Sequence, residues 1–147
     1  MYALHPVTVH FPLGLLLASS LFSVLATRPG REGWAISAYH CLLVGWIASI
    51  VALLTGTADA VRLLTGPDAP RDPTLANWVN AHAFSNLAAV AVYGQALLRL
   101  RRQPNLLTDP TARRGYLQLH AIAAALLVLG GWLGGYLVYQ LGVGVRI

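Results

Sequence analysis

Four apolar stretches, each long enough to cross a lipid bilayer, constrain the fold of this chain more than any other feature. The hydrocarbon core of a bilayer is crossed by about 20 helical residues. Lipid offers the backbone no hydrogen-bonding partner, so a spanning segment closes its own backbone bonds as a helix. Membrane strands are excluded, because the stretches are too long and show no regular alternation. The sequence predicts an all-α integral membrane protein, an up-down bundle of four helices over about 9–26, 34–57, 75–98 and 115–139.

Charged residues are scarce, and this scarcity excludes several classes of protein. They make up 10% of the 147 residues, and hydrophobic residues make up 56%, whereas soluble domains average about 25% charged residues. An ordinary soluble enzyme and a disordered chain are therefore excluded, and the lone Cys41 excludes a disulfide scaffold. Residues 1–147 are predicted to form one transmembrane domain. No cleavable signal peptide is expected, because the start lacks a basic region.

The arginines predict the orientation of the bundle, since basic residues gather in cytoplasmic loops. Seven arginines lie in the first and third loops, and three lie on the opposite side. We therefore expect a multi-pass protein of the bacterial inner membrane with both termini facing outward. The net charge of +5 is then a topology signal rather than a nucleic-acid-binding patch. The seven are Arg28, Arg31, Arg99, Arg101, Arg102, Arg113 and Arg114, against Arg62, Arg71 and Arg146.

Four of the five histidines fall at two depths in the predicted helices. At about 1.5 Å per residue, His40 and His120 lie about 10 Å from the cytoplasmic edge. His10 and His82 both lie about 25 Å from that edge. Each pair comes from alternate helices, which stand on a diagonal of an up-down bundle. A histidine from each helix of a diagonal can therefore face its counterpart across the interior.

Paired histidines across a bundle favour haem, because two neutral imidazoles bind haem iron from opposite faces. The sequence predicts two stacked b-type haems, the outer held by His10 and His82 and the inner by His40 and His120. Covalent attachment is excluded by the absence of C-x-x-C-H. A non-haem metal site is disfavoured, since no helix carries a His-x-x-His or Glu-x-x-His pair. His5 remains an alternative to His10, or a partner for a propionate, a quinone or a proton.

Small and basic residues supply the remaining candidate cofactor contacts. Gly131 and Gly134 share the helical face of His120 at the outer level, where the His10–His82 haem would need room. Gly14 follows His10 by one turn, on nearly the same helical face, and leaves that face without a side chain. Haem propionates need cationic partners near the interface, and Arg113 and Arg114 are candidates on the inner side.

Four segments resemble a bacterial family of predicted four-helix membrane proteins known as domain of unknown function 2231. They are HPVTVHFPLGLL, TGTADA, AHAFSN and GGWLGGYLVYQLGVGV, and the resemblance covers nearly the whole chain. It implies a membrane location and the four-helix fold, without an activity. The histidine layout is also similar to that of the transmembrane cytochromes b that use ascorbate, although no motif specific to those enzymes is present.

The expected function is electron transfer by a membrane b-type cytochrome, as a carrier or anchor subunit rather than a stand-alone enzyme. Its partners would be a quinone or a redox protein, for example a Rieske-type or other periplasmic electron carrier. Membership of a larger complex or a homo-oligomer is open. Two alternatives remain. One is a cofactor-free helical scaffold of a respiratory complex, and the other is a small transporter or proton pathway that uses the histidines and Asp59.

Overall fold

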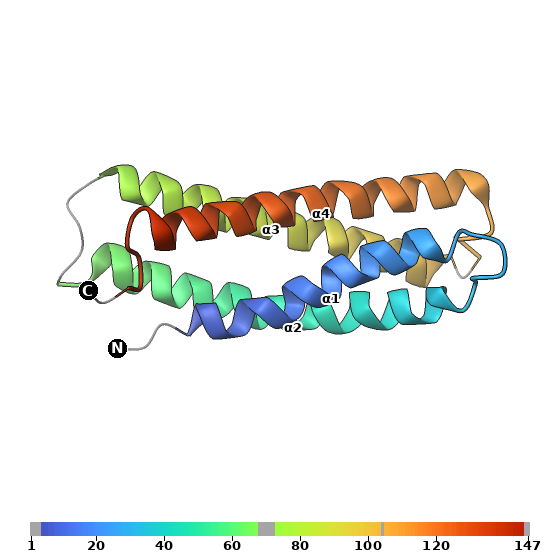
Figure 1. Cartoon of the computed structure of the whole chain (residues 1–147), viewed down its shortest axis with the longest axis horizontal. Coiled ribbons are helices and arrows are strands. Elements are labelled where there is room, and N and C mark those ends of the chain that lie inside the picture. The colour runs from blue at the N-terminus through green and yellow to red at the C-terminus, as the bar shows by residue number, and fades with distance from the viewer. Residues whose placement is uncertain (1–3, 68–72, 104, 146–147) are drawn as a thin grey trace.

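A computed structural model describes residues 4–67, 73–103 and 105–145, and it contains four α-helices and no strand in these ranges. The helices are α1 (His5–Leu25), α2 (Trp34–Thr65), α3 (Pro73–Arg102) and α4 (Pro110–Tyr139). Figure 1 shows them side by side as one elongated bundle. The predicted all-α four-helix fold is confirmed.

The helices run up and down in sequence order. The start of α1, the end of α2, the start of α3 and the end of α4 lie at one end of the bundle, here called the terminal end, as Figure 1 shows. The α1–α2 and α3–α4 connections lie at the other, the arginine-rich end. Helix α1 packs against α2 and α4, and α3 packs against α4 and α2. The pairs α1/α3 and α2/α4 are therefore the diagonals, in agreement with the sequence prediction.

Local sequence signals explain where the helices begin and end. Pro6 occupies the first turn of α1, where its missing N–H costs no hydrogen bond. The Asp109 side chain accepts hydrogen bonds from the Thr111 and Ala112 backbone N–H groups and caps α4. Helix α2 runs on to Thr65, beyond the predicted end near residue 57. No glycine or proline after Gly56 stops it before Gly66.

The core includes an inward-facing row on α1 and another on α2, each repeating at steps of three and four residues. On α1 the buried residues are Pro12, Leu16, Ser19 and Ser23. On α2 they are Ala38, Leu42, Gly45, Ser49 and Ala52. This 3.5-residue average is that of left-handed helix bundles. Many members are small or hydroxylic, which is typical of helix contacts in membranes.

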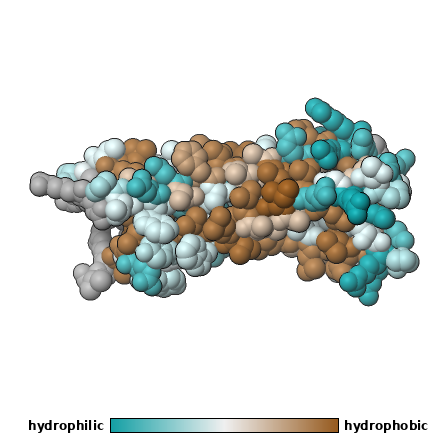
Figure 2. Space-filling model, turned by 90° about the horizontal axis from the view of Figure 1, so that it is seen from above, coloured by the Kyte–Doolittle hydropathy of each residue, from teal (hydrophilic) through white to brown (hydrophobic). Residues whose placement is uncertain are grey.

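Within the described ranges, three helices are long and apolar enough to cross a membrane, namely α1, α2 and α4. Figure 2 shows an apolar middle section between hydrophilic ends, with the densest hydrophilic surface at the arginine-rich end. The 30-residue α3 runs the length of the bundle but is more polar than the other helices. The four predicted apolar segments thus correspond to the four helices of the bundle, and three of these helices have the length and hydropathy of a membrane span.

Candidate functional site

His5 of α1 and His82 of α3 meet inside the bundle near its terminal end. Their ring centroids are 5.9 Å apart, and the ring planes are nearly perpendicular at 81°. The two residues come from helices on a diagonal, so their contact crosses the interior. Both side chains are half-buried. The structure thus brings one predicted ligand, His82, together with His5, which the sequence left as an alternative to His10.

Each of these imidazoles is fixed by a backbone carbonyl of a neighbouring helix. His5 Nδ1 lies 2.9 Å from the Ala52 carbonyl oxygen of α2, and His82 Nδ1 lies 2.8 Å from the Gly130 carbonyl oxygen of α4. A carbonyl only accepts, so both Nδ1 atoms carry the proton. Both Nε2 atoms therefore keep a lone pair. A metal-ligating histidine usually donates the N–H of its other ring nitrogen, the one that does not bind the metal, to a carbonyl or a carboxylate.

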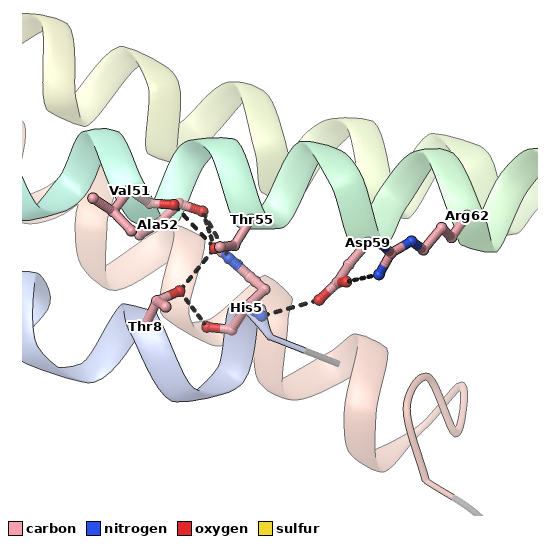
Figure 3. A network of polar contacts seen from close by, with 7 residues as sticks. All are labelled: His5, Thr8, Val51, Ala52, Thr55, Asp59 and Arg62. Atoms are coloured by element: carbon pink, nitrogen blue, oxygen red, sulfur yellow. Dashed lines mark hydrogen bonds and ion pairs between the residues drawn. The ribbon is translucent and has the colours of Figure 1, made fainter. Parts of the chain in front are cut away.

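A carboxylate of α2 holds the start of α1 in place, as Figure 3 shows. The His5 backbone N–H donates to Asp59 Oδ2 at 2.9 Å, and Arg62 lies 3.7 Å from the other Asp59 oxygen. Thr8 donates to the His5 carbonyl and contacts the Thr55 hydroxyl at 2.8 Å. A free N–H group at a helix start gains from an anionic acceptor. Sequence reasoning missed this cap, because the partners are 54 residues apart.

Glycines lie against both histidine rings. A Cβ atom added at Gly56 would lie 2.8 Å from His5 Nδ1, and one at Gly134 would lie 3.0 Å from His82 Cε1. At Gly130 the added atom would lie 2.5 Å from the side-chain amide of Asn86. That amide donates to the His82 carbonyl at 2.8 Å. These positions have no room for a side chain while the rings stay where they are.

Two of the expected glycines lie elsewhere. Gly134 lies at the outer level beside a histidine, as the sequence suggests. Gly131 and Gly14 are exposed and have no atom near an added Cβ. Gly130 is buried in place of Gly131, because the buried row of α4 passes from His120 through Ala123 and Leu127 to Gly130 in steps of three and four residues.

The placement of His10 and His40 differs from the expected pairing. Both side chains are exposed on the outside of the bundle, and His10 Nδ1 contacts the Pro6 carbonyl of its own helix at 2.7 Å. His10 comes two residues before the buried Pro12, and two residues turn a helix by about 200°. His40 stands two residues from both Ala38 and Leu42, which are buried. The expectation used depth, whereas rotation about the helix axis decides which side chains meet.

His120 faces inward, but its neighbours are tyrosines and a serine rather than His40. The side chain is 2% exposed, and its ring lies edge-on to Tyr116 and Tyr93 at 4.5 and 5.5 Å. Ser20 Oγ lies 3.0 Å from His120 Nδ1, 2.9 Å from the Tyr93 hydroxyl and 3.2 Å from the Leu16 carbonyl. The Ser20 hydroxyl thus joins His120 Nδ1 to Tyr93, and the direction of the Ser20–His120 bond depends on the tautomer of the imidazole. His120 Nε2 is buried and has no hydrogen-bond partner.

The remaining candidate residues lie away from the histidine pair. Arg113 and Arg114 are in the first turns of α4 at the arginine-rich end, beside a shallow groove that Pro110 and Gln118 also line. Arg71 and Arg146 fall outside the described residues. Within the described ranges, no group of three or more His, Cys, Asp or Glu side chains could hold a metal ion. A site with two protein ligands, as in bis-histidine haem, needs no such group.

The comparison with protein families gives a match over almost the whole chain. A family described as Predicted membrane protein (DUF2231) matches residues 1–146. The match covers more than half of the chain, so the chain belongs to this family and is a predicted membrane protein. No curated protein and no solved structure matches the chain.

Proposed function

We propose that this DUF2231 membrane protein binds one b-type haem between His5 and His82 and transfers electrons within the membrane. The observation that carries the proposal is the contact of the two imidazoles across the bundle interior, with their ring centroids 5.9 Å apart. His5 donates its Nδ1 proton to a backbone carbonyl of α2, and His82 donates its Nδ1 proton to a backbone carbonyl of α4. Both Nε2 atoms keep the lone pair with which they would hold the haem iron.

The spacing of the rings fits a shared metal. An imidazole nitrogen binds a metal at about 2 Å, so two imidazoles on opposite sides have ring centres about 6 Å apart. Gly56 and Gly134 leave the positions beside the two rings without side chains. A bound haem would supply one-electron chemistry. The chain would hold the iron with His5 and His82, fix both rings through α2 and α4, and keep water away.

A single haem fits the placement of the histidines better than the two predicted from depth. The second pair needs His40 to face His120, and His40 is exposed on the outer face of α2. His10 is likewise outside. The haem would then lie at the terminal end, which we expect from the arginine distribution to face the outside of the bacterial inner membrane. A quinone or a periplasmic redox protein, including a Rieske-type carrier, would exchange electrons there.

A cofactor-free scaffold subunit is the second candidate, and one observation favours it. The Nδ1 bonds of His5 and His82 already link α1 to α2 and α3 to α4, which is how histidines join membrane helices without a cofactor. The two candidates differ in colour, since a haem protein absorbs visible light and a scaffold does not.

The test is a haem titration of the purified protein produced with added haem. We expect one haem per chain and a Soret band with paired visible bands in the reduced state. His5→Ala and His82→Ala should each lose the haem. His10→Ala and His40→Ala are matched controls, because these side chains are exposed, and they should keep it. A colourless wild-type protein would support the scaffold, and loss of haem in His10→Ala alone would restore the pairing by depth.

A further inference from the structure

The arginine-rich end of the bundle carries a large excess of positive charge, which the proposed haem site does not use. Seven arginines lie there, against the two carboxylates of Glu32 and Asp109. Each carboxylate accepts a hydrogen bond from a nearby backbone N–H group, and neither forms an ion pair with an arginine among the described residues. Figure 2 shows the densest hydrophilic surface at this end. An anion is therefore the kind of ligand that this end attracts.

Two of these arginines line a groove on the outside of α4. Arg113 and Arg114 stand in the first turns of the helix, and Leu117, Gln118 and Ala121 line the groove further along. These residues recur at steps of three and four, so they share one face of the helix. Arg114, Gln118 and Ala121 are exposed. The groove therefore opens to the surroundings of the bundle and not to its interior.

A third guanidinium adds to the positive charge at this turn of α4. Arg99 extends from α3 toward α4, and a Cβ atom added at Gly115 would lie 3.0 Å from Arg99 Nη1. Gly115 directly follows Arg114, and its lack of a side chain leaves room for Arg99. Like charges repel one another, and an anion bound beside these guanidiniums offsets that repulsion.

The groove changes from charged to apolar along α4, from the end of the bundle toward its middle. At about 1.5 Å per residue, Ala121 lies about 10 Å deeper than Arg114. Beyond the groove, the exposed Ala125 and Val128 continue the same face. A phospholipid has the same order, with a phosphate at the interface, ester carbonyls below it and acyl chains toward the bilayer centre. A free phosphate ion would use only the charged part.

We propose that this groove binds the headgroup of an anionic phospholipid. Arg113 and Arg114 hold the phosphate, because guanidinium groups bind phosphate oxygens by strong charge-assisted hydrogen bonds. The Gln118 amide donates to an ester carbonyl, and Leu117 and Ala121 contact the first methylene groups of an acyl chain. A zwitterionic lipid binds less well, since the arginines repel its ammonium group. We expect the arginine-rich end to face the cytoplasmic leaflet, whose anionic lipids give that surface a negative potential.

Native mass spectrometry of the full chain in detergent, with defined lipids added, tests the proposal. We expect the wild type to bind phosphatidylglycerol about tenfold more tightly than phosphatidylcholine. The double variant Arg113→Gln/Arg114→Gln should bind phosphatidylglycerol about tenfold more weakly than the wild type. Arg101→Gln/Arg102→Gln is the matched control, because it removes the same charge from exposed positions at the end of α3, and it should bind like the wild type. Equal losses in the two double variants, or equal binding of the two lipids, would overturn the proposal.

Two further measurements separate the lipid from a free anion and from misfolding. Inorganic phosphate at millimolar concentration should not displace phosphatidylglycerol, and displacement would overturn a lipid as the occupant. Ala121→Trp fills the groove without changing the charge and should lose the lipid, whereas Ala91→Trp, at an exposed position of α3, should keep it. Lipid binding by Ala121→Trp would also overturn the proposal. His82→Ala should keep the lipid while it loses the haem, so the two proposals can fail separately.

Discussion

Alanine at Gly56 tests whether the His5 ring is locked in its position. The added Cβ atom would lie 2.8 Å from His5 Nδ1 and 2.9 Å from Cε1, well inside normal contact distance. The ring cannot turn away without losing the 2.9 Å bond from Nδ1 to the Ala52 carbonyl. The backbone cannot move away easily either, because Asp59 holds the His5 N–H at 2.9 Å.

The size of the effect follows from three contributions to the free energy of unfolding. Forcing an extra methyl group into a packed interior costs about 1–3 kcal/mol. Losing the histidine hydrogen bond costs about 0.5–1.5 kcal/mol. Alanine in place of glycine within a helix contributes about 0.8–1.0 kcal/mol in favour of folding. The expected net change is a loss of about 1–3 kcal/mol, since the packing term dominates.

The assay is chemical unfolding in detergent micelles, followed by helical circular dichroism. Gly131→Ala is the matched control, because nothing lies within 4 Å of its added Cβ. This control should be as stable as the wild type or up to about 1 kcal/mol more stable. The haem content of Gly56→Ala should fall, and that of Gly131→Ala should not. If Gly56→Ala unfolds at the same denaturant concentration as the control, His5 is not locked and the reasoning fails.

Three further predictions concern other polar contacts. Asp59→Ala should lower stability by about 1 kcal/mol, because it removes the acceptor at the start of α1, and Asp59→Asn should lose less; equal losses in denaturant unfolding would contradict a capping role. Ser20→Ala leaves the buried His120 Nδ1 without its hydrogen-bond partner and should cost about 1–3 kcal/mol, whereas the exposed Ser37→Ala should change stability by less than about 0.5 kcal/mol. Asp109→Ala removes the cap of α4 and should cost about 1 kcal/mol in the same assay, and an unchanged midpoint would refute it.

The number, order and diagonal arrangement of the helices could be predicted from the sequence, because each depends on a strong local pattern. Apolar length defines the helices, and short loops between them make consecutive helices antiparallel neighbours. The ends of the helices could be predicted less well. An apolar run ends where the lipid ends, whereas a helix continues to the next helix-breaking glycine or proline. Helix α2 shows this, because it extends from the apolar residues past Asp59 and Arg62 to Thr65.

The rotation of each helix, rather than the depth of each histidine, decides which histidines meet. His5 precedes Pro12 by seven residues, which returns to within about 20° of the same helix face. His82 precedes Ala89 by the same interval, and both Pro12 and Ala89 are buried. What the sequence could not provide is the rotation of each helix, because the inward row becomes known only when helices pack.

The rotation of α2 about its own axis decides how many haems one chain can hold with its own histidines. Three contacts fix this rotation. An added Cβ at Gly45 would lie 3.0 Å from Leu15 Cβ, so α1 and α2 touch closely along this face. The Ser19 hydroxyl donates to the Ala38 carbonyl at 2.8 Å, and the Trp46 indole N–H donates to the Val90 carbonyl of α3 at 3.0 Å. Bringing His40 to the interior would require α2 to turn by about 160°. That turn would break both hydrogen bonds and replace Gly45 with larger side chains at the α1 contact. A second haem held by His40 and His120 of the same chain therefore requires a different packing of α2.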